Sequence, residues 1–166
     1  MQERIPKEFE LKRFDLPDMG HREMDDLLKK QLICRISFND QPYPYTLPME
    51  YYYSGDVLYF HFTTTGKKME LLNKDPNVTV EIDWSNETLT DYKSIIIRGK
   101  LIPVDNPYER NTINLAMTSV VRNKAGIKSL LKLPTKTKGV DYLAASNIPL
   151  ALLKLDVKEM VGKKSH

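Results

Sequence analysis

Residues 63–68 hold the densest group of side chains that could bind a small anion. Their sequence is Thr-Thr-Thr-Gly-Lys-Lys, and a short segment with helical spacing of apolar residues follows. The N-terminus of a helix offers unpaired backbone N–H groups and partial positive charge, which attract anions. Two lysines in that first turn are unfavourable unless an anion is bound, so we interpret Lys67 and Lys68 as phosphate ligands. The alternative is a solvated lysine pair at the end of a strand.

His61, on the predicted strand before this turn, is the second candidate. The turn is not a Walker A loop, because that motif needs a glycine five residues before the Gly66-Lys67 pair, where His61 stands. A histidine on the strand face that leads into the turn could donate a hydrogen bond to a ligand or transfer a proton. We name His61 as the candidate catalytic residue, against the alternative of an ordinary hydrogen-bonded histidine. The other histidines are His21 and His166, so no metal site is predicted.

Tyrosines crowd the strand that precedes the one carrying His61. Packing between strands is the ordinary explanation, and a site for a flat aromatic ligand is the alternative. Pro48 lies in the middle of this strand and cannot donate a ladder hydrogen bond, which predicts a bulge or a sheet edge there. The tyrosines are Tyr43, Tyr45, Tyr51, Tyr52 and Tyr53.

The elements that must position these residues are mostly extended segments with short turns, which favours a barrel with helical inserts. Gly99 in the fifth strand is interpreted as a bulge or bend. Asn106, Pro107 and Glu109 are typical of a helix start, with Asn106 as the cap and Glu109 reaching back to it. Strands are predicted at residues 33–38, 45–53, 57–63, 78–84, 94–104 and 149–157, and helices at 21–30, 67–73 and 107–123, with a further short helix at 127–133 in an otherwise irregular, basic stretch.

Length and composition favour one soluble domain. The 166 residues carry 25 basic and 22 acidic side chains, so the net charge of +3 gives no reason to expect a nucleic-acid partner. We expect residues 1–20 to form an irregular arm and residues 21–166 a single domain, with a tail from residue 158. No signal peptide or membrane span is predicted, and the lone Cys34 is expected to be a buried, inert thiol, so we expect a cytoplasmic protein.

The segment from Leu32 to Asp83 closely resembles the core of a known family. This is the FMN-binding split-barrel family related to pyridoxamine 5′-phosphate oxidase, and more narrowly its nitroimidazole-reductase or nitroimidazole-resistance branch. The motifs that carry the resemblance are Pro48-Met49-x-Tyr51, Tyr59-Phe60-His61, Gly66-Lys67-Lys68 followed by Leu71-Leu72 and Asp75-Pro76, and Tyr92-Lys93-Ser94 followed by Gly99-Lys100.

The resemblance implies a mainly β fold, a six-stranded antiparallel split β-barrel with flanking helices. It also implies a homodimer with FMN at the interface. Lys67 and Lys68 match the basic pair that holds the FMN phosphate, and residues 47–51 match the strand that passes the flavin ring. The implied cofactor-binding residues are Pro48, Met49, Glu50, Tyr51, His61, Phe62, Thr63, Lys67, Lys68 and Ser94.

Two departures from the family pattern narrow the function. The Arg-x-His motif with which pyridoxamine phosphate oxidases bind substrate phosphate is missing from the C-terminal strand, so we do not expect that activity. Leu47 stands where the family usually has a phosphate-binding arginine. Phosphate binding would therefore depend more strongly on Lys67 and Lys68.

We therefore expect a flavoprotein oxidoreductase that passes electrons from reduced FMN to a small flat acceptor of the aromatic or nitro type. The protein would supply positioning and electrostatics for chemistry that the flavin carries. The alternatives are a non-catalytic flavin carrier or sensor, or a member of the same barrel that binds a deazaflavin or haem.

Overall fold

The computed structural model describes residues 16–123 and 150–166 of the chain. The predicted helix at residues 127–133 lies outside these residues, as does most of the predicted N-terminal arm. In chain order the elements are α1 (His21–Lys30), β1 (Ile33–Phe38), β2 (Tyr45–Glu50), β3 (Tyr52–Ser54), β4 (Val57–Thr63), α2 (Lys67–Lys74), β5 (Asn77–Ser85), β6 (Tyr92–Pro103), α3 (Pro107–Asn123) and β7 (Leu150–Lys164).

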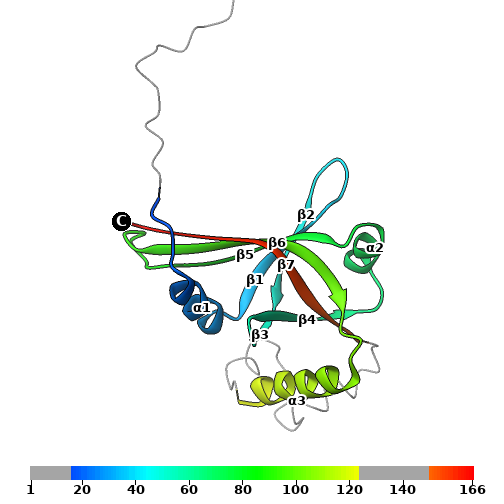
Figure 1. Cartoon of the computed structure of the whole chain (residues 1–166). Helices are drawn as coiled ribbons and strands as arrows, with labels where there is room; N and C mark the ends of the chain where they lie inside the picture. Colours follow the sequence, from blue (N-terminus) through cyan, green and yellow to red (C-terminus); the bar gives the residue numbers. More distant parts are fainter. Residues whose placement is uncertain (1–15, 124–149) are drawn as a thin grey trace, which may run out of the picture.

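Within the described residues, the strands form one antiparallel sheet in the order β2-β1-β5-β6-β7-β4-β3. The two edge strands, β2 and β3, are separated in the chain only by Tyr51. β2 pairs with β1 while β3 pairs with β4, so this single bent segment joins the two edges and curls the sheet into a split barrel (Figure 1). If β2 and β3 are counted as the one strand predicted at residues 45–53, the predicted six strands are those observed.

The bend at Tyr51 has a local cause. The Tyr51 ring is buried, and its hydroxyl donates to the Leu28 carbonyl of α1 at 2.9 Å. Its backbone N–H donates to Leu32 O at 3.2 Å, which extends the pairing of β1 and β2 by one bond before the chain turns into β3. Pro48 pairs with Arg35 on the edge strand β2, where its missing N–H breaks no bond to another strand, as its position in the sequence predicted.

The barrel interior is filled by the alternate residues of each strand. Leu58, Phe60 and Phe62 of β4 are fully buried, as the alternation in the sequence predicted. Cys34 is also buried, as predicted, and burial raises the pKa of its thiol to about 12. A smaller apolar cluster packs α3 against the outside of the sheet through Tyr59, Val104, Ile113 and Leu152.

The last strand is longer than the sequence suggested. A strand at residues 149–157 followed by a tail was wrong, because β7 continues to Lys164. The polar residues of the expected tail find backbone partners along β6, from Arg98 paired with Glu159 to Lys93 paired with Lys164. The ladder shifts register between Arg98 and Gly99, which confirms the predicted irregularity at this glycine.

The start of α3 follows the predicted cap only in part. Asn106 Oδ1 accepts the Glu109 N–H at 3.0 Å, as a capping residue does. Glu109 does not reach back to Asn106, because its carboxylate instead accepts bonds from Tyr59 and Lys154, each at 2.9 Å. This contact fastens the first turn of α3 to β4 and β7.

Candidate functional site

The turn between β4 and α2 carries the predicted phosphate ligands. Thr63 Oγ1 donates to Thr65 O at 3.0 Å, and Gly66 takes a positive φ of 99°, which a side chain would strain. No side chain caps α2, which begins at Lys67. The turn therefore leaves the first N–H groups of α2 available to a ligand, as the sequence predicted.

Lys67 already has an acidic partner. Its Nζ lies 2.7 Å from Asp40 Oδ2 and 4.7 Å from the centre of the Tyr45 ring. The bond to Asp40 raises the pKa of Lys67 and lowers that of Asp40. An anion at Lys67 would have to share the lysine with Asp40 or displace that carboxylate.

Lys68 is placed differently, next to apolar side chains of β2 and β4. Its Nζ lies 4.7 Å from the centre of the Phe62 ring and 3.8 Å from Met49 Sδ. The side chain is half-buried, and burial lowers the pKa of its ammonium group. Among residues 16–123 and 150–166, no carboxylate forms an ion pair with Lys68. The structure thus brings Lys68, Met49 and Phe62 together around an uncompensated positive charge.

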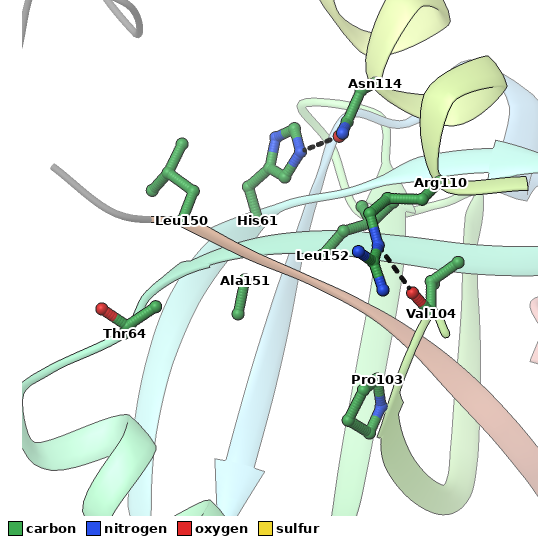
Figure 2. Close-up of a pocket in the computed structure, with 9 residues that line it drawn as sticks. All are labelled: His61, Thr64, Pro103, Val104, Arg110, Asn114, Leu150, Ala151 and Leu152. Atoms are coloured by element: carbon green, nitrogen blue, oxygen red, sulfur yellow. Dashed lines mark hydrogen bonds between the residues drawn. The ribbon is translucent and has the colours of Figure 1, made fainter. Parts of the chain in front are cut away.

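His61 lies on the opposite face of β4 from Phe62, under α3. Its Nε2 is 2.8 Å from Asn114 Oδ1. Figure 2 shows the two side chains meeting at one side of a pocket into which the Arg110 guanidinium also extends. The pocket has a volume of about 470 Å³ and is lined by His61, Thr64, Pro103, Val104, Arg110, Asn114, Leu150, Ala151 and Leu152. The sequence therefore predicted the face of His61 correctly, but this pocket does not include the lysines.

The other predicted site residues are scattered in one chain. Pro48 and Glu50 are exposed on the outer side of β2, whereas Tyr51 is buried and its hydroxyl is used by α1. Ser94 pairs with Lys163 near the far end of β7, while Thr63 pairs with Leu150 at its start. These positions are separated by about 40 Å of strand at ~3.3 Å per residue. A single chain does not bring Ser94 to the β4–α2 turn.

Arg110 and Asn114 are pocket residues that the sequence analysis missed. Their spacing of four places them on one face of a helix, a signal that was present in the sequence. Nothing in the sequence indicated that this face would cover β4, because the packing of α3 on the sheet joins residues far apart in the chain.

The fold is a split barrel with α3 on its outer face, and the comparisons with known proteins agree with it. A family model described as pyridoxamine 5′-phosphate oxidase matches residues 20–162. No curated protein matches the sequence significantly. The chain belongs to the pyridoxamine 5′-phosphate oxidase family, as the motifs of the sequence indicated.

Solved structures resemble the chain at low sequence identity, so they support the fold alone. An FAD-binding protein of Mesorhizobium loti has a TM-score of 0.68 at 18% identity, over 91% of this chain and 99% of that one. A proposed 5-nitroimidazole antibiotic resistance protein of Bacteroides thetaiotaomicron has a TM-score of 0.60 at 20% identity, over 90% and 92%. An FAD- and haem-binding protein of Mycobacterium smegmatis has a TM-score of 0.61 at 15% identity, over 89% and 72%.

No group of three or more histidine, cysteine or acidic side chains is placed to hold a metal ion in residues 16–123 and 150–166. In the same part of the chain, no helix is long and apolar enough to cross a membrane.

Proposed function

We propose that this protein binds FMN and uses it as an oxidoreductase, passing electrons from the reduced flavin to a small flat acceptor such as a nitroaromatic compound. The observation that carries the proposal is the half-buried ammonium of Lys68 at the uncapped start of α2, with no acidic partner in the described residues. A phosphate there would compensate this charge and accept hydrogen bonds from the helix N-terminus.

The residues around Lys68 fit one end of a flavin phosphate. Met49 and Phe62 contact the ammonium on its apolar side, and the uncapped start of α2 supplies backbone N–H groups at the same turn. Lys67 can add a second positive charge if the ligand competes with Asp40. Membership of the family, and neighbours described as FAD-binding, support a flavin over other phosphate-containing ligands.

A bound reduced flavin would supply a hydride equivalent, that is, two electrons and one proton. Together with one further proton, this converts a nitro group to a nitroso group and water. His61 is the residue that we propose to donate that proton. Asn114 holds the imidazole in place through its Oδ1, which accepts Nε2–H. The proton given to the acceptor would therefore come from Nδ1 of the doubly protonated ring, which is left neutral after the transfer. The pocket between β4 and α3 leaves space next to His61 for an acceptor.

We also propose that the protein is a homodimer with the flavin at the interface. Ser94 can contact the flavin held at Lys68 only if it comes from a second copy of the chain, since about 40 Å of strand separates the two in one copy. Ile96 and Val161 support the same proposal, because these directly paired residues of β6 and β7 are 37% and 41% exposed on the outer face of the sheet.

An absorbance spectrum before and after addition of FMN, followed by gel filtration, tests the proposal. We expect flavin bands near ~450 and ~370 nm to travel with the protein at the elution volume of a dimer. Parallel samples with FAD identify the preferred flavin. A folded protein that retains neither flavin would contradict the proposal and favour the deazaflavin or haem alternative. Retained flavin without turnover, with reduced nicotinamide donors and a panel of acceptors, would indicate a carrier or sensor.

A further inference from the structure

The pocket beneath α3 carries a positive charge that the contacts described above do not use. Arg110, in the first turns of α3, donates through Nε to Val104 O at 2.9 Å, and its Nη2 lies 3.5 Å from Asp105 O. Both acceptors are neutral carbonyls. In residues 16–123 and 150–166 no carboxylate forms an ion pair with Arg110, because the neighbouring Glu109 is bonded to Lys154 and Tyr59.

The guanidinium still has donors available for a ligand. Arginine carries five N–H donors in one plane, and these two contacts occupy only part of that set. Figure 2 shows the guanidinium extending into the pocket between Val104 and Leu152. Arg110 remains exposed, so an anion can reach it from solvent. A planar guanidinium matches a carboxylate better than it matches a neutral polar group.

The rest of the pocket defines the body of the ligand. Its walls are largely apolar, whereas its other polar groups are the His61–Asn114 pair and the Thr64 hydroxyl. A volume of about 470 Å³ admits a molecule of one aromatic ring. The lining thus combines one cation, an apolar wall and a small set of groups that can form hydrogen bonds. The apolar wall is formed by Pro103, Val104, Leu150, Ala151 and Leu152.

We infer that this pocket binds a small aromatic carboxylic acid, with Arg110 holding the carboxylate and the apolar wall holding the ring. The acid is then the class of acceptor in the proposed flavin-dependent reaction, with its other end directed toward His61. That last assignment rests on the proposed function, whereas binding of the acid does not.

Titration of the purified full-length protein with benzoate and with benzamide, followed by calorimetry, tests the inference. The two probes have nearly the same shape and differ in charge. We expect benzoate to bind at least about tenfold more tightly than benzamide, the size of one charge-assisted hydrogen bond. Arg110→Gln should remove this preference, and Arg110→Lys should restore part of it. Arg98→Gln is the matched control, because Arg98 pairs with Glu159 on the outer face of the sheet.

A second variant changes the charge of the pocket while leaving Arg110 itself in place. Asn114→Asp keeps an oxygen acceptor for His61 but adds a negative charge to the lining. We expect it to weaken benzoate binding about tenfold and to leave benzamide binding unchanged. Equal affinity for both probes in the wild type, or an equal loss with Arg98→Gln, would overturn the inference.

Repeating the benzoate titration on FMN-loaded protein separates the sources of the anion. Benzoate and FMN should bind together if the pocket holds an acceptor. If benzoate and FMN instead displace each other, Arg110 binds the phosphate of the cofactor. The assignment of the acid as the acceptor would then be wrong. Benzoate binding that depends on Arg110, in a protein that retains no flavin, would leave the acid site standing and contradict the proposed function.

Discussion

His61 Nε2 and Asn114 Oδ1 lie 2.8 Å apart, joining the outer face of β4 to the helix that covers it. This contact fixes the imidazole at the side of a pocket, on the opposite face of β4 from Phe62 and Lys68. The proposed proton donor and the proposed phosphate ligand therefore act from two sides of one strand. A ligand that meets both must pass around the end of β4 at the threonine turn.

Replacement of His61 tests its role in turnover. We expect His61→Ala to retain FMN and to lower the rate of acceptor reduction by about 10²-fold or more, the usual range for loss of a general acid. Asn114→Ala should lower the rate less, because the imidazole stays but loses its orientation. Flavin absorbance measures binding, and steady-state reduction measures the rate. An unchanged rate for His61→Ala would remove this histidine from the mechanism.

Replacement of Lys68 separates a binding role from a structural one. Lys68→Met keeps the length and apolar contacts of the side chain and removes a half-buried charge without an acidic partner in the described residues. We expect FMN binding to weaken by about 1.5–3 kcal/mol. Without flavin, the melting temperature should stay the same or rise, because an unpaired buried charge is unfavourable.

Fluorescence titration with FMN and thermal unfolding measure the two effects of Lys68→Met. Lys74→Met, at the exposed last position of α2, is the matched control and should change neither quantity. A Lys68→Met protein that binds FMN as tightly as the wild type would exclude the phosphate role.

Gly99 is expected to tolerate no side chain. A Cβ at this position would lie 2.4 Å from the Asp156 carbonyl oxygen and 3.1 Å from its carbon, both backbone atoms of the neighbouring strand. Gly99→Ala should therefore lower the free energy of unfolding by about 1–3 kcal/mol, the usual cost of overpacking. Denaturant unfolding measures the loss. Lys100→Ala, at the next and exposed position of β6, should cost far less; equal losses would contradict the steric explanation.

The pH dependence of folding should report the contact that holds α3. The hydrogen bond from Lys154, and then that from Tyr59, lowers the pKa of Glu109 below its usual value of 4.5. A carboxylate with a lowered pKa in the folded state stabilises the protein above pH 4.5, and this contribution is lost as the pH falls through the folded pKa. Wild type should thus be more stable than Glu109→Gln at pH 7, and the gap should narrow below pH 4.5.

Melting temperatures between pH 7 and pH 3 measure the effect of Glu109→Gln. Glu87→Gln, in the exposed loop between β5 and β6, is the control and should follow the wild type throughout. A gap between wild type and Glu109→Gln that is independent of pH would mean that the ion pair with Lys154 does not stabilise α3.

Much of the fold was readable from local patterns. Alternation of period two identified the buried face of β4, and Gly99 marked the irregular place in β6. The caps and turns located most of the remaining element boundaries to within a few residues. The same local reading found the uncapped lysine pair, because a helix start and its charges lie close together in sequence.

Tertiary structure alone decided how these pieces meet. The closure of the barrel at Tyr51 depends on α1 accepting its hydroxyl, and the length of β7 depends on the partners that β6 supplies. The placement of Asn114 against His61, and of Arg110 in the same pocket, joins residues about fifty positions apart. A sequence determines which face of each element is apolar, but which partner covers that face is settled only by packing between distant segments.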